Sequence, residues 1–158
     1  MDPLTSLYNR RKFCEVLRYE VDRELRYKNG LALIMVDIDK FKNINDTFGH
    51  KAGDNALMLI SQVIKNSMRS TDTVARWGGE EFIMLIVNTD KEEVLGIAEK
   101  LRKSIAEMTP EDTDSITASF GITFFNEGDN EEAFVSRADK ALYKAKENGR
   151  NRIDVVTI

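Results

Sequence analysis

An uninterrupted run of apolar residues limits the fold of this 158-residue chain more than any other feature. The run extends from Leu31 to Val36 and closes on two acids, Asp37 and Asp39. It is far too short to cross a bilayer, which takes about 20 residues. An unbroken apolar run of this length is typical of a strand that is buried on both faces. We therefore predict a buried central strand at residues 31–38 that ends in carboxylates.

Segments on both sides of this strand show the three- and four-residue spacing of apolar side chains that is typical of amphipathic helices. The predicted helices are residues 10–28, 41–48, 54–68, 91–107 and 131–148. The other predicted strands are residues 73–77, 81–87, 115–125 and 153–158.

The order of these elements predicts the fold class. After the first helix come strand, helix, strand, strand, helix and strand, which is the split βαβ or ferredoxin-like arrangement. A last helix and a last strand follow. We therefore expect an α/β (α+β) domain with a central, mostly antiparallel sheet and flanking helices, a layout that polymerase palm domains share. A fold class by itself does not determine function.

Composition argues against several classes of function. The net charge of −4 and the pI of about 5.2 disfavour a general nucleic-acid binder, which usually presents a basic surface. Cys14 is the only cysteine and His50 the only histidine, so no internal disulfide and no cysteine zinc cluster can form. Cys14 lies beside Phe13 and near Leu17, and we expect it to be buried. No membrane segment or signal peptide is visible, so we expect a cytoplasmic location.

Two pairs of acids are predicted to meet on neighbouring strands. Asp37 and Asp39 end the central strand, and Glu80 and Glu81 lie at the start of another. The alternative for the first pair is a solvated strand end. If the strands are neighbours, however, the carboxylates repel one another and the site favours a cation. Oxygen ligands without cysteine or histidine fit Mg²⁺ or Mn²⁺, which carboxylates and substrate phosphates hold together in nucleotide enzymes.

The dipeptide Gly78-Gly79 lies between two extended segments. Glycine accepts the positive φ of a tight turn, so we predict a hairpin there. An ordinary hairpin turn is one interpretation. The other is that the absence of side chains allows the turn to approach a triphosphate or a base closely.

Polar residues after the central strand are candidates for recognising a base and its phosphates. Guanine presents N1–H and N2–H₂ donors, which suit the Asp54 carboxylate, and Asn45 offers an amide. The alternative for Asp54 is an N-cap that starts a helix. Lys146 and Arg150 are candidate phosphate ligands, and their alternative is a favourable cationic helix C-terminus.

Taken together, these segments resemble a GGDEF domain over nearly the whole chain. Any one motif is weak, but five in order are specific. The matching stretches are residues 2–11 (DPLTSLYNRR), residues 36–54 from VDIDKFK to GD, residues 76–82 (RWGGEEF), residues 119–122 (SFGI) and residues 138–152 from ADKALY onward.

The resemblance implies roles for individual residues. Asp37 and Glu80 would bind the metal ions with the help of the Ile38 carbonyl, and Glu81 would complete the metal site. Asn45 would read guanine together with Asp54. The residues implied in holding the rest of the GTP are Lys42, Lys146, Arg150, the backbone at Phe41, and Gly78 and Gly79.

The resemblance also implies an activity. The 3′-hydroxyl of one GTP would attack the α-phosphate of another, twice, to give cyclic di-GMP and two pyrophosphates. Metal ions would stabilise the charge on the phosphoryl oxygens. Each domain would hold one GTP, so two copies would face each other as a homodimer. We expect residues 1–158 to be one catalytic domain, either bare or separated from a regulatory region.

Arg69 and Asp72 resemble the RxxD site at which this family binds cyclic di-GMP as an inhibitor. Arginine forks onto phosphate or guanine, and aspartate accepts from guanine. The alternative is a helix end with a turn acid. Two other functions remain open for the chain: a catalytically inactive GTP or cyclic di-GMP receptor, and a different nucleotidyl cyclase or palm-type enzyme.

Overall fold

The computed structural model describes all residues from Met1 to Ile158. None of its helices is both long enough and apolar enough to traverse a membrane. In chain order the elements are α1 (Arg10–Tyr27), β1 (Leu31–Ile38), α2 (Phe41–Phe48), α3 (His50–Asn66), β2 (Thr73–Arg76), β3 (Glu81–Val87), α4 (Lys91–Ala106), β4 (Ala118–Phe124), α5 (Glu131–Glu147) and β5 (Ile153–Val155).

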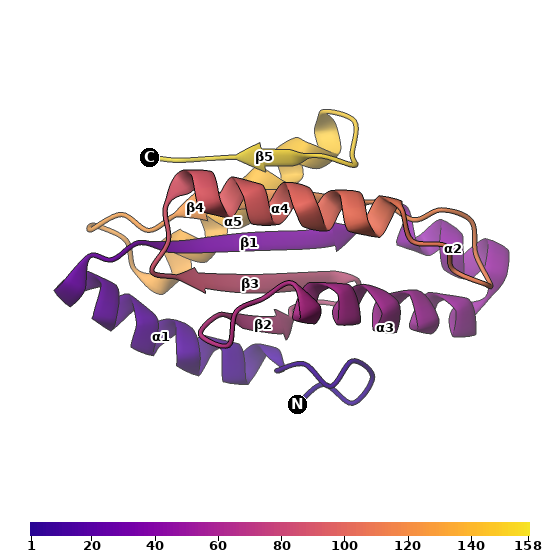
Figure 1. Cartoon of the computed structure of the whole chain (residues 1–158), viewed down its shortest axis with the longest axis horizontal. Coiled ribbons are helices and arrows are strands. Elements are labelled where there is room, and N and C mark those ends of the chain that lie inside the picture. The colour runs from indigo at the N-terminus through magenta and orange to yellow at the C-terminus, as the bar shows by residue number, and fades with distance from the viewer.

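The five strands form one sheet in the order β2-β3-β1-β4-β5, with β1 at its centre (Figure 1). The pairs β2–β3, β3–β1 and β1–β4 are antiparallel, as the split βαβ order predicted. Strand β5 adds the single parallel pair, beside β4. Every residue of β1 is buried, which confirms the predicted central strand.

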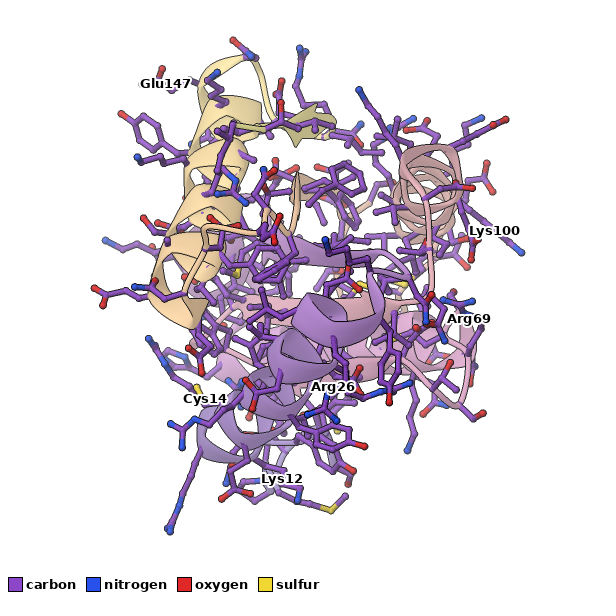
Figure 2. The ribbon with its side chains drawn as sticks, turned by 90° about the vertical axis from the view of Figure 1, so that its left-hand side faces the viewer. Lys12, Cys14, Arg26, Arg69, Lys100 and Glu147 are labelled. Carbon is purple, nitrogen blue, oxygen red and sulfur yellow. The ribbon has the colours of Figure 1, made fainter.

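Helices cover both faces of the sheet. Alternate side chains of β1 point to opposite faces: Ile34 and Val36 pack with the apolar residues of α3 and α4, whereas Leu33 and Met35 pack with those of α1 and α5. Figure 2 looks along the strands and shows α4 and α5 on opposite sides of the sheet. The chain therefore has one apolar layer on each side of a shared sheet.

Several predicted boundaries need correction. Helix α3 begins at His50, because Gly49 at φ +93° ends α2 and is also the N-cap of α3. Asp54 is therefore inside the helix, and its interpretation as an N-cap is wrong. Strand β5 stops at Val155, three residues short of the chain end. Cys14 is exposed rather than buried, because its neighbours Phe13 and Leu17 occupy the face of α1 that packs on the sheet (Figure 2).

Three chain segments that lie far apart in the sequence meet at one end of the sheet. In Figure 1 the end of β1, the beginning of β3 and the turn before β5 all lie at the same end, and α2 follows directly from β1 there. The antiparallel pairing of β1 with its two neighbours causes this convergence. Most of the predicted site residues belong to these segments.

Candidate functional site at the end of the central strand

The end of β1 lies against the start of β3. Asp37 is paired with Glu81 in the register of the two strands, and the Ile38 N–H donates to the Glu80 carbonyl at 3.2 Å. The expected meeting of Asp37 and Glu80 is therefore observed, and it follows from the register. Three carboxylates converge at this junction.

A lysine from α5 faces these carboxylates. Lys146 donates a hydrogen bond and forms an ion pair with Asp37, whose side chain is only 4% exposed. Burial nevertheless raises the pKa of Asp37, and the charge of Asp39 adds to this rise, while Lys146 and Arg150 oppose it. The carboxylate is thus held in a place where one ammonium does not fully compensate for lost hydration.

The two glutamates experience the same excess of negative charge. Burial and then the repulsion from Asp37 raise the pKa of Glu80 and also that of Glu81, although Lys146 lowers both. Carboxylates with raised pKa values at one site favour the approach of a further cation. The arrangement therefore suits a ligand that brings positive charge.

The donor set fits a magnesium ion that a substrate completes. No group of three or more His, Cys, Asp or Glu side chains is arranged closely enough to cage a metal by itself. Mg²⁺, however, is commonly held by one or two carboxylates together with substrate phosphates rather than by a cage made only of protein. Asp37 and Glu80 offer hard oxygen ligands of this kind, and their repulsion is the property that a divalent cation relieves.

Helices α2 and α3 place the residues predicted to contact a base. A Cβ on Gly53 would lie 1.9 Å from Asn45 Oδ1, so only glycine leaves room for this amide between the two helices. The adjacent Asp54 is exposed and forms no hydrogen bond or ion pair. The structure thus presents an amide on α2 that lies against Gly53 and an uncommitted carboxylate on α3.

The hairpin between β2 and β3 differs from the prediction in its backbone. Neither Gly78 nor Gly79 has a positive φ, so the predicted conformational reason for these glycines is wrong. The N–H groups of Trp77 and Gly78 donate to the Glu81 carbonyl at 2.8 and 3.3 Å. A Cβ on Gly79 would meet no atom within 4 Å, so the fold does not require glycine there and the space above the turn is open.

Sequence reasoning missed the support of this hairpin. Arg76 donates to the Gly79 carbonyl at 2.8 Å, and Asp2 accepts from Arg76 at 3.2 Å. Asp2 is itself held by the N–H and the hydroxyl of Thr5. The N-terminal segment therefore braces the turn. The only signal in the sequence was the motif at residues 2–11, in which no role for Asp2 was apparent.

Two of the three predicted phosphate-binding cations lie near Asp37, and the third lies apart on α2. Lys146 in the last turn of α5 contacts Asp37, and Arg150 in the next turn is close enough for its charge to lower the pKa of Asp37. Lys42 is exposed in the first turn of α2, where Phe41 begins the helix directly after the sheet and leaves N–H groups without partners in the helix. Lys42 has no hydrogen bond or ion pair to the carboxylates.

Arg69 and Asp72 lie at the opposite end of β3. Arg69 donates to Asp72 at 3.1 and 3.2 Å and to the Val87 carbonyl at 2.6 Å, and it pairs with Glu93 at 3.3 Å. The Asp72 side chain is 1% exposed and also accepts from the Val87 N–H. Both residues line a cavity of about 340 Å³. Lys100, a further basic residue considered for this site, lies on the same side of the molecule in Figure 2, but it is not among the partners of Arg69.

Known proteins resemble the chain in sequence. "Diguanylate cyclase A" of Treponema denticola is 43% identical over 139 residues, which are 85% of this chain and 38% of that protein. "Diguanylate cyclase DgcP" of Pseudomonas aeruginosa is 45% identical over 157 residues, or 98% of this chain and 23% of that protein. The chain thus spans well under half the length of these relatives.

Solved structures resemble it in fold, and a family model covers most of it. The coiled coil and GGDEF domain of DgcB from Caulobacter crescentus, solved with c-di-GMP, matches 99% of this chain and 85% of its own at a TM-score of 0.93 and 31% identity. The active GGEEF domain of a diguanylate cyclase from Vibrio cholerae matches 95% of this chain and 97% of its own, at a TM-score of 0.90 and 38% identity. The family model "Diguanylate cyclase, GGDEF domain" matches residues 1–152. The chain therefore belongs to the GGDEF domain family.

Proposed function

We propose that this domain is a diguanylate cyclase that condenses two GTP molecules into cyclic di-GMP and two pyrophosphates. The observation that carries the proposal is the cluster of Asp37, Glu80 and Glu81 at the junction of β1 and β3, with Lys146 beside it. The names of the relatives support the same reaction. GTP as substrate would place the domain in the cytoplasm.

Asp37, Glu80 and Glu81 would hold Mg²⁺ or Mn²⁺, with the Ile38 carbonyl as a further ligand. The bound ion would stabilise charge on the phosphoryl oxygens and lower the pKa of the attacking 3′-hydroxyl. The carboxylates would hold the ion at the end of the sheet. Their raised pKa values mean that binding a divalent cation would also release protons near the pKa values of these groups.

The remaining candidates would orient the nucleotide. The free carboxylate of Asp54 would accept from N1–H and N2–H₂ of guanine, and Asn45 would use the amide that lies against Gly53. The open space over Gly79 would admit the nucleotide close to the backbone of the Gly78-Gly79 turn. The groups proposed to bind the triphosphate are Lys146, Arg150, Lys42 and the N–H groups at Phe41.

The reaction would need a second copy of the domain. In each of two steps a bond forms between the 3′-oxygen of one GTP and the α-phosphorus of the other, the bond to pyrophosphate breaks, and the hydroxyl proton leaves. One site at one end of one sheet offers one guanine position, so we propose that two domains face each other as a homodimer. Residues 1–158 would then be one catalytic domain.

Turnover of GTP tests the proposal. Purified protein with GTP and Mg²⁺ should produce cyclic di-GMP and pyrophosphate, and the rate per molecule should rise with protein concentration as dimers form. Chelation of the metal should stop it. GTP binding without either product at high protein concentration would instead favour the inactive receptor, and products other than cyclic di-GMP would favour a different nucleotidyl cyclase.

We also propose that Arg69 and Asp72 take part in inhibition by cyclic di-GMP, which the cavity beside them supports. Asp72 is buried in contacts within the protein, so the exposed part of Arg69 would make the first contact with a phosphate. Replacing Arg69 with Ala should raise the concentration of cyclic di-GMP that halves the rate by about tenfold. Unchanged inhibition would leave this pair with a purely structural role.

A further inference from the structure

The turn between α5 and β5 has an unusual backbone. Gly149, Arg150 and Asn151 follow one another with φ values of +121°, +62° and +46°. Two of them are not glycine, and non-glycine residues persist in this region only when their surroundings hold them there. The contacts that hold this turn therefore decide where Arg150 lies.

Asp39 holds the turn from inside the protein. Its Oδ2 accepts from the Asn151 N–H at 2.9 Å and from the Thr117 hydroxyl at 2.7 Å, and its Oδ1 accepts from the Ser119 hydroxyl at 2.6 Å. Asp39 is buried, so these donors replace the water that its charge has lost. Asp37 has one side-chain partner, the Lys146 ammonium, whereas Asp39 accepts three hydrogen bonds from the protein and is the poorer candidate for a metal ligand.

Arg102 of α4 contacts the side chain of Asn151 from the outside of the protein. Its Nη1 donates to Asn151 Oδ1 at 2.9 Å, and its Nε and Nη2 donate to Glu99 at 3.0 and 2.6 Å. Glu99 thereby orients the guanidinium. Asn151 is thus fastened by its main chain to the end of the sheet and by its side chain to α4.

Arg150 lies next to this fastened residue. Its guanidinium makes no hydrogen bond or ion pair within the protein, and Arg150 lines a cavity of about 540 Å³ together with Asp39 at the end of β1 and Asn43 of α2. The backbone of the turn fixes where this exposed side chain begins. A turn that is held in place therefore keeps a free cation at the end of the sheet that carries the carboxylate cluster, whereas a loose turn would not.

We propose that Asp39 and Arg102 are positioning residues, which hold Asn151 so that Arg150 faces the terminal phosphates of the bound nucleotide. This inference rests on the proposed function and extends it to α4, a helix that contributes no predicted site residue. Neither residue would touch the substrate. Their effect would pass through the turn alone.

Arg102 offers the cleanest test because its hydrogen bonds go to Glu99 and Asn151 and none goes to the carboxylate cluster. Arg102→Ala should raise the KM for GTP about three- to tenfold and leave kcat within about twofold, because ground-state contacts to the phosphates weaken. Lys103→Ala removes one charge from the same helix without any contact to the turn and should change neither constant. Unchanged KM in Arg102→Ala would overturn the inference.

A double-mutant cycle shows whether the effect passes through Arg150. In an Arg150→Ala background, Arg102→Ala should have little further effect on KM, because the cation it positions is gone. Asn151→Gly keeps the N–H and tolerates the positive φ but lacks Oδ1, so it should reproduce Arg102→Ala. Full additivity of the Arg102 and Arg150 substitutions would refute the mechanism.

Binding without turnover separates this inference from the proposed reaction. The probes are 3′-deoxy-GTP and 3′-deoxy-GMP, which lack the attacking hydroxyl, titrated with Mg²⁺ by calorimetry. Arg102→Ala should weaken the triphosphate about three- to tenfold and leave the monophosphate unchanged. Equal weakening of both probes would indicate general damage and overturn the inference. A wild-type protein that binds GTP but makes no cyclic di-GMP would refute the proposed function while this comparison could still be made.

Discussion

Helix α5 contributes two cations, and each pairs with a buried carboxylate: Arg137 with Asp129, and Lys146 with Asp37. The two pairs differ in how many hydrogen bonds each carboxylate receives from its cation. Arg137 donates to both oxygens of Asp129 at 2.9 and 2.6 Å, to the Thr123 hydroxyl at 2.7 Å and to the Phe124 carbonyl at 2.7 Å. This forked contact lowers the pKa of Asp129. The guanidinium and the carboxylate leave little capacity for any other partner.

The pair of Lys146 and Asp37 is the opposite case. Asp37 is as buried as Asp129, with 4% of each side chain exposed, but its pKa is raised because burial and neighbouring acids outweigh the ammonium. Asp129 is therefore fully paired within the protein, whereas the burial of Asp37 is not fully compensated. The directions of the two pKa shifts distinguish these carboxylates where burial alone does not.

The largest expected effect is on stability, from breaking the pair of Arg137 and Asp129. Arg137→Met should lower the free energy of unfolding by about 3–5 kcal/mol, because it leaves Asp129 buried without its cation. Urea denaturation measures the loss. Arg18→Met, which removes an exposed pair with Glu131, is the matched control and should cost less than about 1 kcal/mol. Similar losses in the two variants would contradict the structural role of Arg137.

The next largest expected effect is on activity, from changing the carboxylate cluster of Asp37, Glu80 and Glu81. Glu80→Gln keeps the shape of the side chain but removes a metal ligand, so cyclic di-GMP formation should fall at least about a hundredfold. The midpoint of thermal unfolding should not fall, because a repulsive charge is removed. Glu132→Gln, on the exposed surface of α5, should keep full activity. Surviving activity in Glu80→Gln would show that the metal assignment is wrong.

Asp54 extends the comparison to a carboxylate with no protein partner. Asp54→Ala should reduce the preference for GTP over ATP in kcat/KM by up to about a hundredfold, because guanine loses a charged acceptor. The exposed Asp22 on α1 provides the control, and Asp22→Ala should leave the preference intact. An unchanged preference in Asp54→Ala would place base recognition elsewhere.

The smallest effect is the pH dependence of stability without ligand. Glu80 and Glu81 have raised pKa values when folded, so their contribution to stability is present at low pH and is lost as pH rises through those values. The lowered pKa of Asp129 acts in the other direction, and its contribution to stability is lost as pH falls through that value.

Because the pKa of Glu80 is raised, Glu80→Gln should stabilise the protein relative to wild type at pH 7. The gain should be less than about 1 kcal/mol, since solvent screens the partly exposed group. The difference in unfolding free energy should vanish near pH 4, and a difference that grows on acidification would contradict the raised pKa.

Sequence reasoning succeeded where local pattern and global fold agree. The apolar run at residues 31–38 is a central strand, and the helical spacing located all the long helices, because burial of one face is a local property of the pattern. The order of elements gave the sheet topology of the first four strands. Sequence reasoning failed at the start of α3, at Asp54 and at Gly78-Gly79, where the same residue types are compatible with several turn and cap geometries.

The acids Asp37 and Asp39 show most clearly where sequence information ends. The chain alone determined that two carboxylates would stand at the end of a buried strand, two residues apart and beside a second acidic pair. Only the tertiary structure decided that Asp37 pairs with Lys146, whereas Asp39 accepts hydrogen bonds from Thr117, Ser119 and Asn151. Those partners come from 78 to 112 residues further along the chain, and no local pattern encodes them. The physical reason is that a carboxylate takes its role from the donors around it, and folding alone brings those donors into place.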